Sequence, residues 1–177
     1  MTENPPSAPP PVERLAHYTP ADIAEILGDG DDVFGVAEHG LTWLPKEEHF
    51  GIRLDGRLVA HAGLRLLPIA IGGTETRVVG VGGVAVAAGV RGQGLARRVV
   101  AGALDHARTM GPRFGLLFCR EPLVALYERL GWHALHGAVR VEQPAGPVVM
   151  PLRTLWTPLS DDVHWPEGPV RLRSLPM

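Results

Sequence analysis

A short glycine-rich segment, Arg91-Gly92-Gln93-Gly94-Leu95-Ala96, has the residue types of an anion-binding loop. It runs into a segment with helical periodicity. The first turn of a helix carries backbone N–H groups without partners, at the positive end of the helix macrodipole. Glycines let a ligand approach the bare backbone, and Arg91, Arg97 and Arg98 add positive charge nearby. The pattern predicts a site for an anion such as a pyrophosphate, and an ordinary tight turn is the alternative.

Two elements must position this loop. Before it, residues 80–86 are small, apolar and β-branched, which is typical of a strand buried on both faces. After it, Leu95, Val99 and Ala103 recur every fourth residue and therefore share one face of a helix. Gly111-Pro112 ends that helix. The predicted layout is strand, glycine turn, helix.

The same region also contains part of a dinucleotide-binding motif. Gly80, Gly82 and Ala85 fit the pattern G-x-G-x-x-A, but that motif needs a helix to begin at its end. Residues 84–86 continue a strand instead, so we reject this interpretation. The double glycine Gly82-Gly83 inside the strand indicates a bulge or a close backbone approach.

Composition predicts a single globular domain. The chain has 177 residues, of which 45% are hydrophobic and 20% charged, and its net charge is −2. This charge gives no reason to expect nucleic acid or an anionic membrane as a partner. No apolar run approaches the roughly 18 residues of a membrane span, and no signal-peptide pattern begins the sequence, so we expect a cytoplasmic protein. A single cysteine, Cys119, leaves no internal disulfide.

The first residues differ from the rest of the chain. Residues 1–12 are rich in proline and are expected to form a disordered leader, with the domain spanning residues 13–177. Helices are predicted after Thr19-Pro20, after Gly94 and after Glu121-Pro122. The predicted strands are 13–18, 49–54, 57–67, 74–86, 113–119, 132–135 and 148–152. The remaining C-terminal segment is expected to fold back on the domain as an irregular, ordered tail.

Residues 91–96 resemble the acyl-CoA pyrophosphate loop of the GNAT superfamily of N-acetyltransferases. That family's pattern is Gln or Arg, two residues, Gly, one residue, and Gly or Ala, and Arg91, Gly94 and Ala96 fill it. A second stretch, from Leu126 to Trp132, resembles the second GNAT signature, in which a tyrosine is followed four residues later by glycine and an aromatic. The matched stretch runs from about residue 57 to 141.

This resemblance implies the fold and the co-substrate. The implied fold is α/β, with a mixed, splayed sheet of six or seven strands and helices on both faces. Acetyl-CoA is the implied co-substrate, with no metal and with a homodimer as the expected assembly. The Val84 N–H would polarise the thioester carbonyl, while Ala85 and Val86 hold the pantetheine arm. The implied pyrophosphate site comprises Arg91, Gly92, Gln93, Gly94, Leu95, Ala96 and Arg97.

Tyr127 is the predicted general acid. A phenol with a pKa near 10 stays protonated at neutral pH and can donate its proton to a departing thiolate. The general base stays open between His61, His133, His136, Glu38, Asp32 and a chain of water molecules. Cys119 closes an apolar strand, where burial raises the pKa of a thiol and makes it inert.

The acceptor site is expected around residues 29–48, which usually form one wall of that site in GNAT enzymes. Asp32 and Glu38 in this region, with His133 after the second signature, are the predicted acceptor-binding residues. An acidic wall would suit a cationic amine, and a solvated acidic surface is the alternative. The chain looks most like the aminoglycoside 2'-N-acetyltransferase group, but Gly82 stands where that group has a glutamate.

These observations favour an acetyl-CoA-dependent N-acetyltransferase acting on a primary amine of a small molecule, such as an aminoglycoside or another polyamine. Two alternatives stay open. One is a protein or peptide N-acetyltransferase that reads a basic peptide. The other is a non-catalytic GNAT-fold module that binds acyl-CoA and acts as a sensor.

Overall fold

The computed structural model describes residues 8–30 and 32–177. Of the predicted leader, residues 1–7 lie outside the described part of the chain. Val12 already belongs to strand β1 (Val12–Leu15), where it pairs with Ile52, so the domain begins before the expected residue 13. The reason is packing, because the Val12 side chain covers Gly102, where an added Cβ would lie 2.6 Å from a Val12 methyl group.

The described residues form one mixed sheet in the order β6-β9-β5-β4-β3-β10-β7-β8, with β2 joined to β3 and β1 joined to β2. The α/β class and the mixed sheet are confirmed, but ten strands replace the predicted six or seven. Short strands in the proline-rich C-terminal half account for the difference. Beside β1 and the central strands β3 and β4, the sheet contains β2 (Glu48–Leu54), β5 (Phe114–Cys119), β6 (His133–Ala134), β7 (Val139–Val141), β8 (Val148–Val149), β9 (Arg153–Pro158) and β10 (Val170–Leu172).

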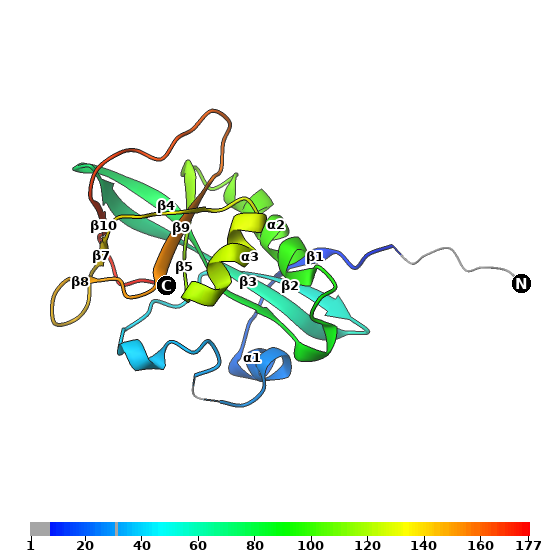
Figure 1. The fold of residues 1–177 in the computed structure, drawn as a ribbon. Helices are drawn as coiled ribbons and strands as arrows, with labels where there is room; N and C mark the ends of the chain where they lie inside the picture. The colour runs from blue at the N-terminus through cyan, green and yellow to red at the C-terminus, as the bar shows by residue number, and fades with distance from the viewer. Residues whose placement is uncertain (1–7, 31) are drawn as a thin grey trace, which may run out of the picture.

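A long hairpin of β3 (Arg57–Ile71) and β4 (Thr74–Val86) forms the centre of the sheet and crosses the molecule diagonally (Figure 1). Side chains alternate between the two faces of a strand. Ala60 and Leu64 of β3 therefore pack into one core, while Leu67 and Ile69 pack into another on the opposite face.

Helices cover both faces, as the resemblance implied (Figure 1). Helix α2 (Leu95–Ala107) packs on the same face as Ala60 and Leu64, together with α3 (Val124–Arg129). Helix α1 (Pro20–Leu27) lies on the other face, where Ile26 contacts the cluster that includes Ala85. Within the described residues there are also three short 3-10 helices, Ala37–His39, Ala88–Val90 and Glu121–Leu123. No helix of the described residues is long and apolar enough to cross a membrane.

The sheet opens between β4 and β5. These parallel strands pair only at Val79–Gly115 and Gly80–Leu116. Immediately beyond, the β3–β4 register shifts at the predicted bulge around Gly82-Gly83, where Gly83 has φ +59°. A bulge bends and twists its strand. Residues 81–86 therefore leave β5, and this edge of β4 is free to face a ligand.

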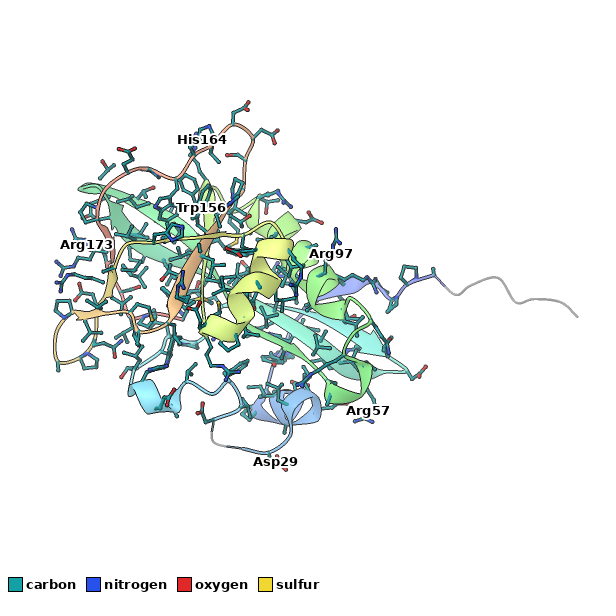
Figure 2. All side chains as sticks on the ribbon, viewed as in Figure 1. Asp29, Arg57, Arg97, Trp156, His164 and Arg173 are labelled. Carbon is teal, nitrogen blue, oxygen red and sulfur yellow. The ribbon has the colours of Figure 1, made fainter. Side chains whose placement is uncertain are left out.

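The C-terminal segment is ordered and more regular than expected. Of the predicted strand 148–152 only Val148–Val149, in β8, is a strand, and β9 begins after it at Arg153, because Pro151 cannot donate a backbone hydrogen bond in a ladder. Trp156 on β9 packs against Trp165 and Phe114, with ring centroids 5.6 and 5.7 Å away. Figure 2 shows Trp156 beneath the loop that carries His164. These aromatic contacts hold the tail on the sheet.

Candidate functional site

A cavity of about 560 Å³ lies where the free edge of β4 meets the N-terminus of α2 and one side of α3. We call it the loop cavity. Every residue predicted to bind the cofactor lines it except Gln93. The residues of that set found in the lining are Val84, Ala85, Val86, Arg91, Gly92, Gly94, Leu95, Ala96 and Arg97. The structure thus brings together two segments that are separated in the sequence by a 3-10 turn.

The N-terminus of α2 opens directly into the loop cavity. Gly94 is the N-cap, has φ +75° and offers no side chain to the first turn. No acidic residue lies in that turn either. The N–H groups of Leu95, Ala96 and Arg97 therefore keep their capacity to bind an anion. Around Gly94 an added Cβ would meet nothing within 4 Å, so there is room for a ligand against the backbone.

The backbone of β4 presents alternate residues to the free edge. The Ala87 N–H donates to the Val59 carbonyl, with an N···O distance of 2.8 Å, so this residue faces β3. By alternation along the strand, Val84 and Val86 face the opposite edge, toward the loop cavity. The Val86 carbonyl accepts a hydrogen bond of 3.2 Å from Arg91 Nε. This bond ties the glycine loop to the strand that precedes it.

The arginines near the loop have different roles. Arg91 and Arg97 line the loop cavity, and Figure 2 shows Arg97 near the start of α2. Arg98 donates instead to the carbonyl oxygen of Pro10 and is half-buried. Arg98 therefore fixes the segment before β1, and the positive charge that faces a ligand comes from Arg91 and Arg97.

A second cavity of about 300 Å³ lies between the splayed strands β4 and β5, and we call it the inner cavity. It shares Phe34, Val84, Arg120, Leu123 and Tyr127 with the loop cavity. A molecule bound along β4 would therefore reach the inner cavity at Val84. The rest of the lining is mainly apolar and aromatic: Val36, Trp43, Val81, Leu117, Phe118, Leu152 and Met177, with Lys46, Gly82, Gly83 and Cys119.

Tyr127 lies at the junction of the two cavities. It is 7% exposed and its ring packs edge-on against Trp132 at 6.2 Å. Burial raises the pKa of its hydroxyl well above the ordinary value of 10, and nearby Cys119 raises it further. Tyr127 is therefore a neutral hydrogen-bond donor at physiological pH. Burial also raises the pKa of the Cys119 thiol to about 11, so Cys119 stays protonated beside it.

His61, a candidate base, lies outside both cavities. It is completely buried, and its Nδ1 atom is 2.7 Å from the Gly83 carbonyl oxygen. Its Nε2 atom is 3.0 Å from His49 Nδ1, and its ring stacks on Tyr18 at 3.6 Å. Burial lowers the pKa of His61 to about 4. This neutral ring supports the bulge and lines neither cavity.

The acceptor residues predicted from charge are not brought together. Asp32 is exposed, and its Oδ1 accepts the N–H of Val36 within its own loop. The side chain of Glu38 is 79% exposed and pairs with His39. His133 is exposed and packs against Trp156 on the far edge of the sheet. None of these three residues lines either cavity.

Residues 29–48 do form a wall of the inner cavity, but with other side chains. Phe34, Val36 and Trp43 contribute to it, together with Lys46. Sequence reasoning missed Lys46, although one signal was present: it is the only lysine in a chain whose lysines and arginines total 17. His136 lies elsewhere, in a separate surface cavity beside β7 and β9. Among residues 8–30 and 32–177, no group of three or more His, Cys, Asp or Glu is placed to hold a metal ion.

Comparison with known proteins is consistent with this geometry. A family model described as an acetyltransferase (GNAT) domain matches residues 18–135. A search of curated proteins gave no match. Among solved structures, YhbS of Escherichia coli in complex with CoA is 22% identical to this chain, with a TM-score of 0.59. The match covers 93% of this chain and 91% of that chain.

Two other structures are similar at comparable levels. A GNAT family acetyltransferase of Brucella melitensis in complex with acetyl-CoA is 18% identical, with 90% of this chain and 94% of that chain covered and a TM-score of 0.51. N-acetylglutamate synthase of Neisseria gonorrhoeae, complexed with coenzyme A and N-acetyl-glutamate, is 15% identical, with 84% of this chain and 35% of that chain covered and a TM-score of 0.56. At these identities the similarity establishes a shared fold.

Proposed function

The chain belongs to the GNAT acetyltransferase family, and we propose that it transfers the acetyl group of acetyl-CoA to a primary amine of a small molecule. One observation carries this proposal. The free edge of β4 leads without interruption to the uncapped N-terminus of α2, and both line the loop cavity. A strand edge and a helix N-terminus are complementary to an amide-bearing arm that ends in a pyrophosphate.

Acetyl-CoA would supply the activated acyl group as a thioester. The N–H groups of the first turn of α2, with Arg91 and Arg97, would bind the pyrophosphate. The Val84 and Val86 backbone groups would pair with the pantetheine arm along the free edge of β4. Val84 lines both cavities, so its N–H would donate to the thioester carbonyl where the loop cavity meets the inner cavity.

Tyr127 is placed to protonate the leaving group, the thiolate of CoA. The amine nitrogen attacks the thioester carbon and forms the C–N bond, and the C–S bond then breaks. The Tyr127 hydroxyl donates its proton to the departing thiolate, the proton released by the amine passes to water, and water returns a proton to Tyr127. A neutral hydroxyl between the two cavities supports catalysis rather than a purely sensing role. Cys119 takes no part because its thiol stays protonated.

The inner cavity is the proposed acceptor site because it adjoins Val84 and Tyr127 on the side opposite the α2 loop. Aminoglycosides, other polyamines, amino sugars and amino acid derivatives all carry a suitable primary amine. The resemblance to the aminoglycoside 2'-N-acetyltransferase group departs at Gly82, where no side chain can act as a base. Homodimer formation, implied by the same resemblance, stays a prediction.

Thiol release from acetyl-CoA in the presence of single amines tests this proposal. The panel should include a kanamycin-type aminoglycoside, spermidine, several amino acids and a basic peptide. Rapid release with one small-amine class would support the proposed function. Rapid release with the peptide alone would favour the protein acetyltransferase. CoA binding without release for any amine would favour the sensor, and absence of CoA binding would refute all three.

A further inference from the structure

The inner cavity is lined by two cationic side chains and, among the described residues, by no Asp or Glu side chain. Its ionic side chains are Lys46 from the loop before β2 and Arg120 from the end of β5. In the described part of the chain Lys46 makes no ion pair. Lys46 is partly buried, and a partly desolvated ammonium that makes no ion pair gains free energy when an anionic group on a ligand pairs with it.

Two paired glycines make room for the lysine stem. Gly63 on β3 pairs directly with Gly82 on β4. A Cβ on Gly63 would clash with the Lys46 stem, lying 2.8 Å from its Cβ and closer still to its Cγ. A Cβ on Gly82 would lie 3.1 Å from Lys46 Cε, and one on Gly83 would lie 3.4 Å from it. Lys46 therefore crosses both strands through a glycine slot that directs its ammonium to the bulge.

The ammonium end of Lys46 lies close to the reacting position. Gly83 immediately precedes Val84, whose N–H is proposed to bind the thioester carbonyl. Met177 closes the same side of the cavity, and its main-chain oxygen would lie 3.4 Å from a Cβ on Gly82. A hydrogen-bond acceptor for an amine N–H and a cation thus lie side by side. An acceptor that uses both would have its acidic group only a few bonds from its amine.

The remaining lining favours an apolar body on the acceptor. Phe34, Trp43 and Phe118 are aromatic, and Trp43 and Phe118 pack edge-on at 6.5 Å. Leu117 and Leu123 add aliphatic surface. A polycation such as spermidine or an aminoglycoside would meet two like charges and few polar partners here, and like-charge contacts disfavour binding.

We propose that the acceptor is a primary amine that carries an acidic group close to the amine on an apolar body, as in an apolar amino acid, and that Lys46 binds the acidic group. This inference rests on the proposed function, because it assigns the substrate class of the same site. Lys46 also acts on the reacting amine. A nearby positive charge lowers the pKa of that amine and increases its neutral, nucleophilic fraction.

Turnover with matched acceptors tests the inference. L-leucine, L-leucinamide and isopentylamine share an apolar body and an amine, but only the first carries a carboxylate. For the wild-type protein we expect a higher kcat/KM with leucine than with either analogue, or with spermidine or kanamycin. Lys46→Met should lower kcat/KM for leucine by about 10- to 100-fold and leave the two analogues nearly unchanged.

Two further variants serve as controls for this comparison. Lys46→Arg keeps the positive charge and should retain part of the leucine activity if the variant protein folds. Arg77→Met removes one exposed positive charge on β4, outside both cavities, and should leave the leucine activity unchanged. A loss in Arg77→Met equal to that in Lys46→Met would contradict a specific role for Lys46.

A binding measurement that does not depend on turnover uses the single lysine. Reductive methylation with ¹³C-formaldehyde labels only Lys46 and the N-terminal amine, so the Lys46 signal can be titrated by NMR. Burial lowers the pKa of Lys46 in the free protein, and bound leucine should raise it while isopentylamine should not. The other titratable or charged groups around this ammonium are His49, His61, Cys119, Tyr127 and Arg120. A Lys46 pKa that is the same with and without leucine would overturn the inference.

The outcomes separate this inference from the proposed function. Turnover of spermidine or kanamycin that Lys46→Met leaves intact would refute the inference and keep the N-acetyltransferase. Absence of CoA binding in the wild-type protein would refute both. Acetylation of Lys46 itself by acetyl-CoA, detected by mass spectrometry without an acceptor, would refute its role as an anion receptor. Preference for leucine that is lost in Lys46→Met supports both.

Discussion

His61 Nδ1 lies 2.7 Å from the carbonyl oxygen of Gly83, and this contact fixes the bulge that turns β4 away from β5. Because a carbonyl oxygen can only accept, the ring proton is on Nδ1, and His49 donates to Nε2 on the other side. The adjacent Val84 N–H is thereby held at the junction of the two cavities. A buried histidine beside the bulge thus positions the backbone donor of the next residue.

Replacing Tyr127 by phenylalanine should abolish most turnover and preserve CoA binding. The phenol is proposed to protonate the leaving thiolate, and general acids contribute about 100- to 10,000-fold to a rate. Steady-state thiol release and CoA calorimetry measure the two effects. Tyr18→Phe is the matched control, because Tyr18 is the only other tyrosine and its buried hydroxyl has no hydrogen-bond partner among the described residues. Equal kcat values for Tyr127→Phe and wild type would rule out the acid role.

Replacing His61 by alanine should destabilise the protein and weaken CoA binding. The substitution removes a buried ring that stacks on Tyr18 and the hydrogen bond to Gly83, which together are worth about 2–4 kcal/mol. The freed bulge no longer holds the Val84 N–H in place. Urea denaturation and CoA titration at a temperature where the variant is folded check both effects. Unchanged CoA affinity in a folded variant would show that His61 supports stability alone.

Stability should depend on pH through the same histidine. Burial lowers the pKa of His61 from 6.5 to about 4, so between these values the unfolded chain binds a proton that the folded chain does not. The stabilising contribution is complete above pH 6.5 and is lost as the pH falls through about 4. The free energy of unfolding should decrease in this window by up to about 1.4 kcal/mol per pH unit.

Urea denaturation at several pH values across that window measures the slope, and His61→Gln should flatten it. His49, whose pKa is also lowered by burial, contributes in the same direction and remains in that variant. An identical slope in wild type and His61→Gln would show that other groups cause the pH dependence.

Arg97→Ala should weaken CoA binding by about fivefold at low salt, because Arg97 lines the loop cavity beside the helix N-terminus. The difference should shrink at high salt, since exposed charges are screened. Arg57→Ala is the control: Arg57 is also exposed but pairs with Glu25 on α1, away from the loop (Figure 2). A salt-independent loss, or an equal loss in Arg57→Ala, would argue against an anion site at α2.

The glycine loop and the bulge could be predicted because both are local. Gly94 ends a turn and begins a helix within a few residues, and Gly82-Gly83 weaken the strand in which they stand. The resemblance in the same stretch then pointed to the loop residues that the structure gathers around one cavity. Only Gln93, which is exposed, is absent from that lining.

The acceptor side was not predictable in this way. Composition showed an acidic loop, but not which of its side chains line the inner cavity, and in the structure Phe34 and Lys46 line it while Asp32 and Glu38 do not. The reason for Gly82 also lies far away in sequence, since Lys46 crosses over it. Strands β7 and β10 pair with each other although they lie far apart in the sequence, so the local pattern of residues did not predict them.

Backbone amide shifts on addition of CoA test the central claim most directly. The account predicts that the largest ¹H–¹⁵N changes fall on two separate segments, Val84 and Val86 on β4 and residues 95–97 in the first turn of α2. It predicts smaller changes at Arg57 and across β7 and β8. Binding with changes confined to other surfaces, or no binding at all, would contradict the assignment of one continuous acyl-CoA site.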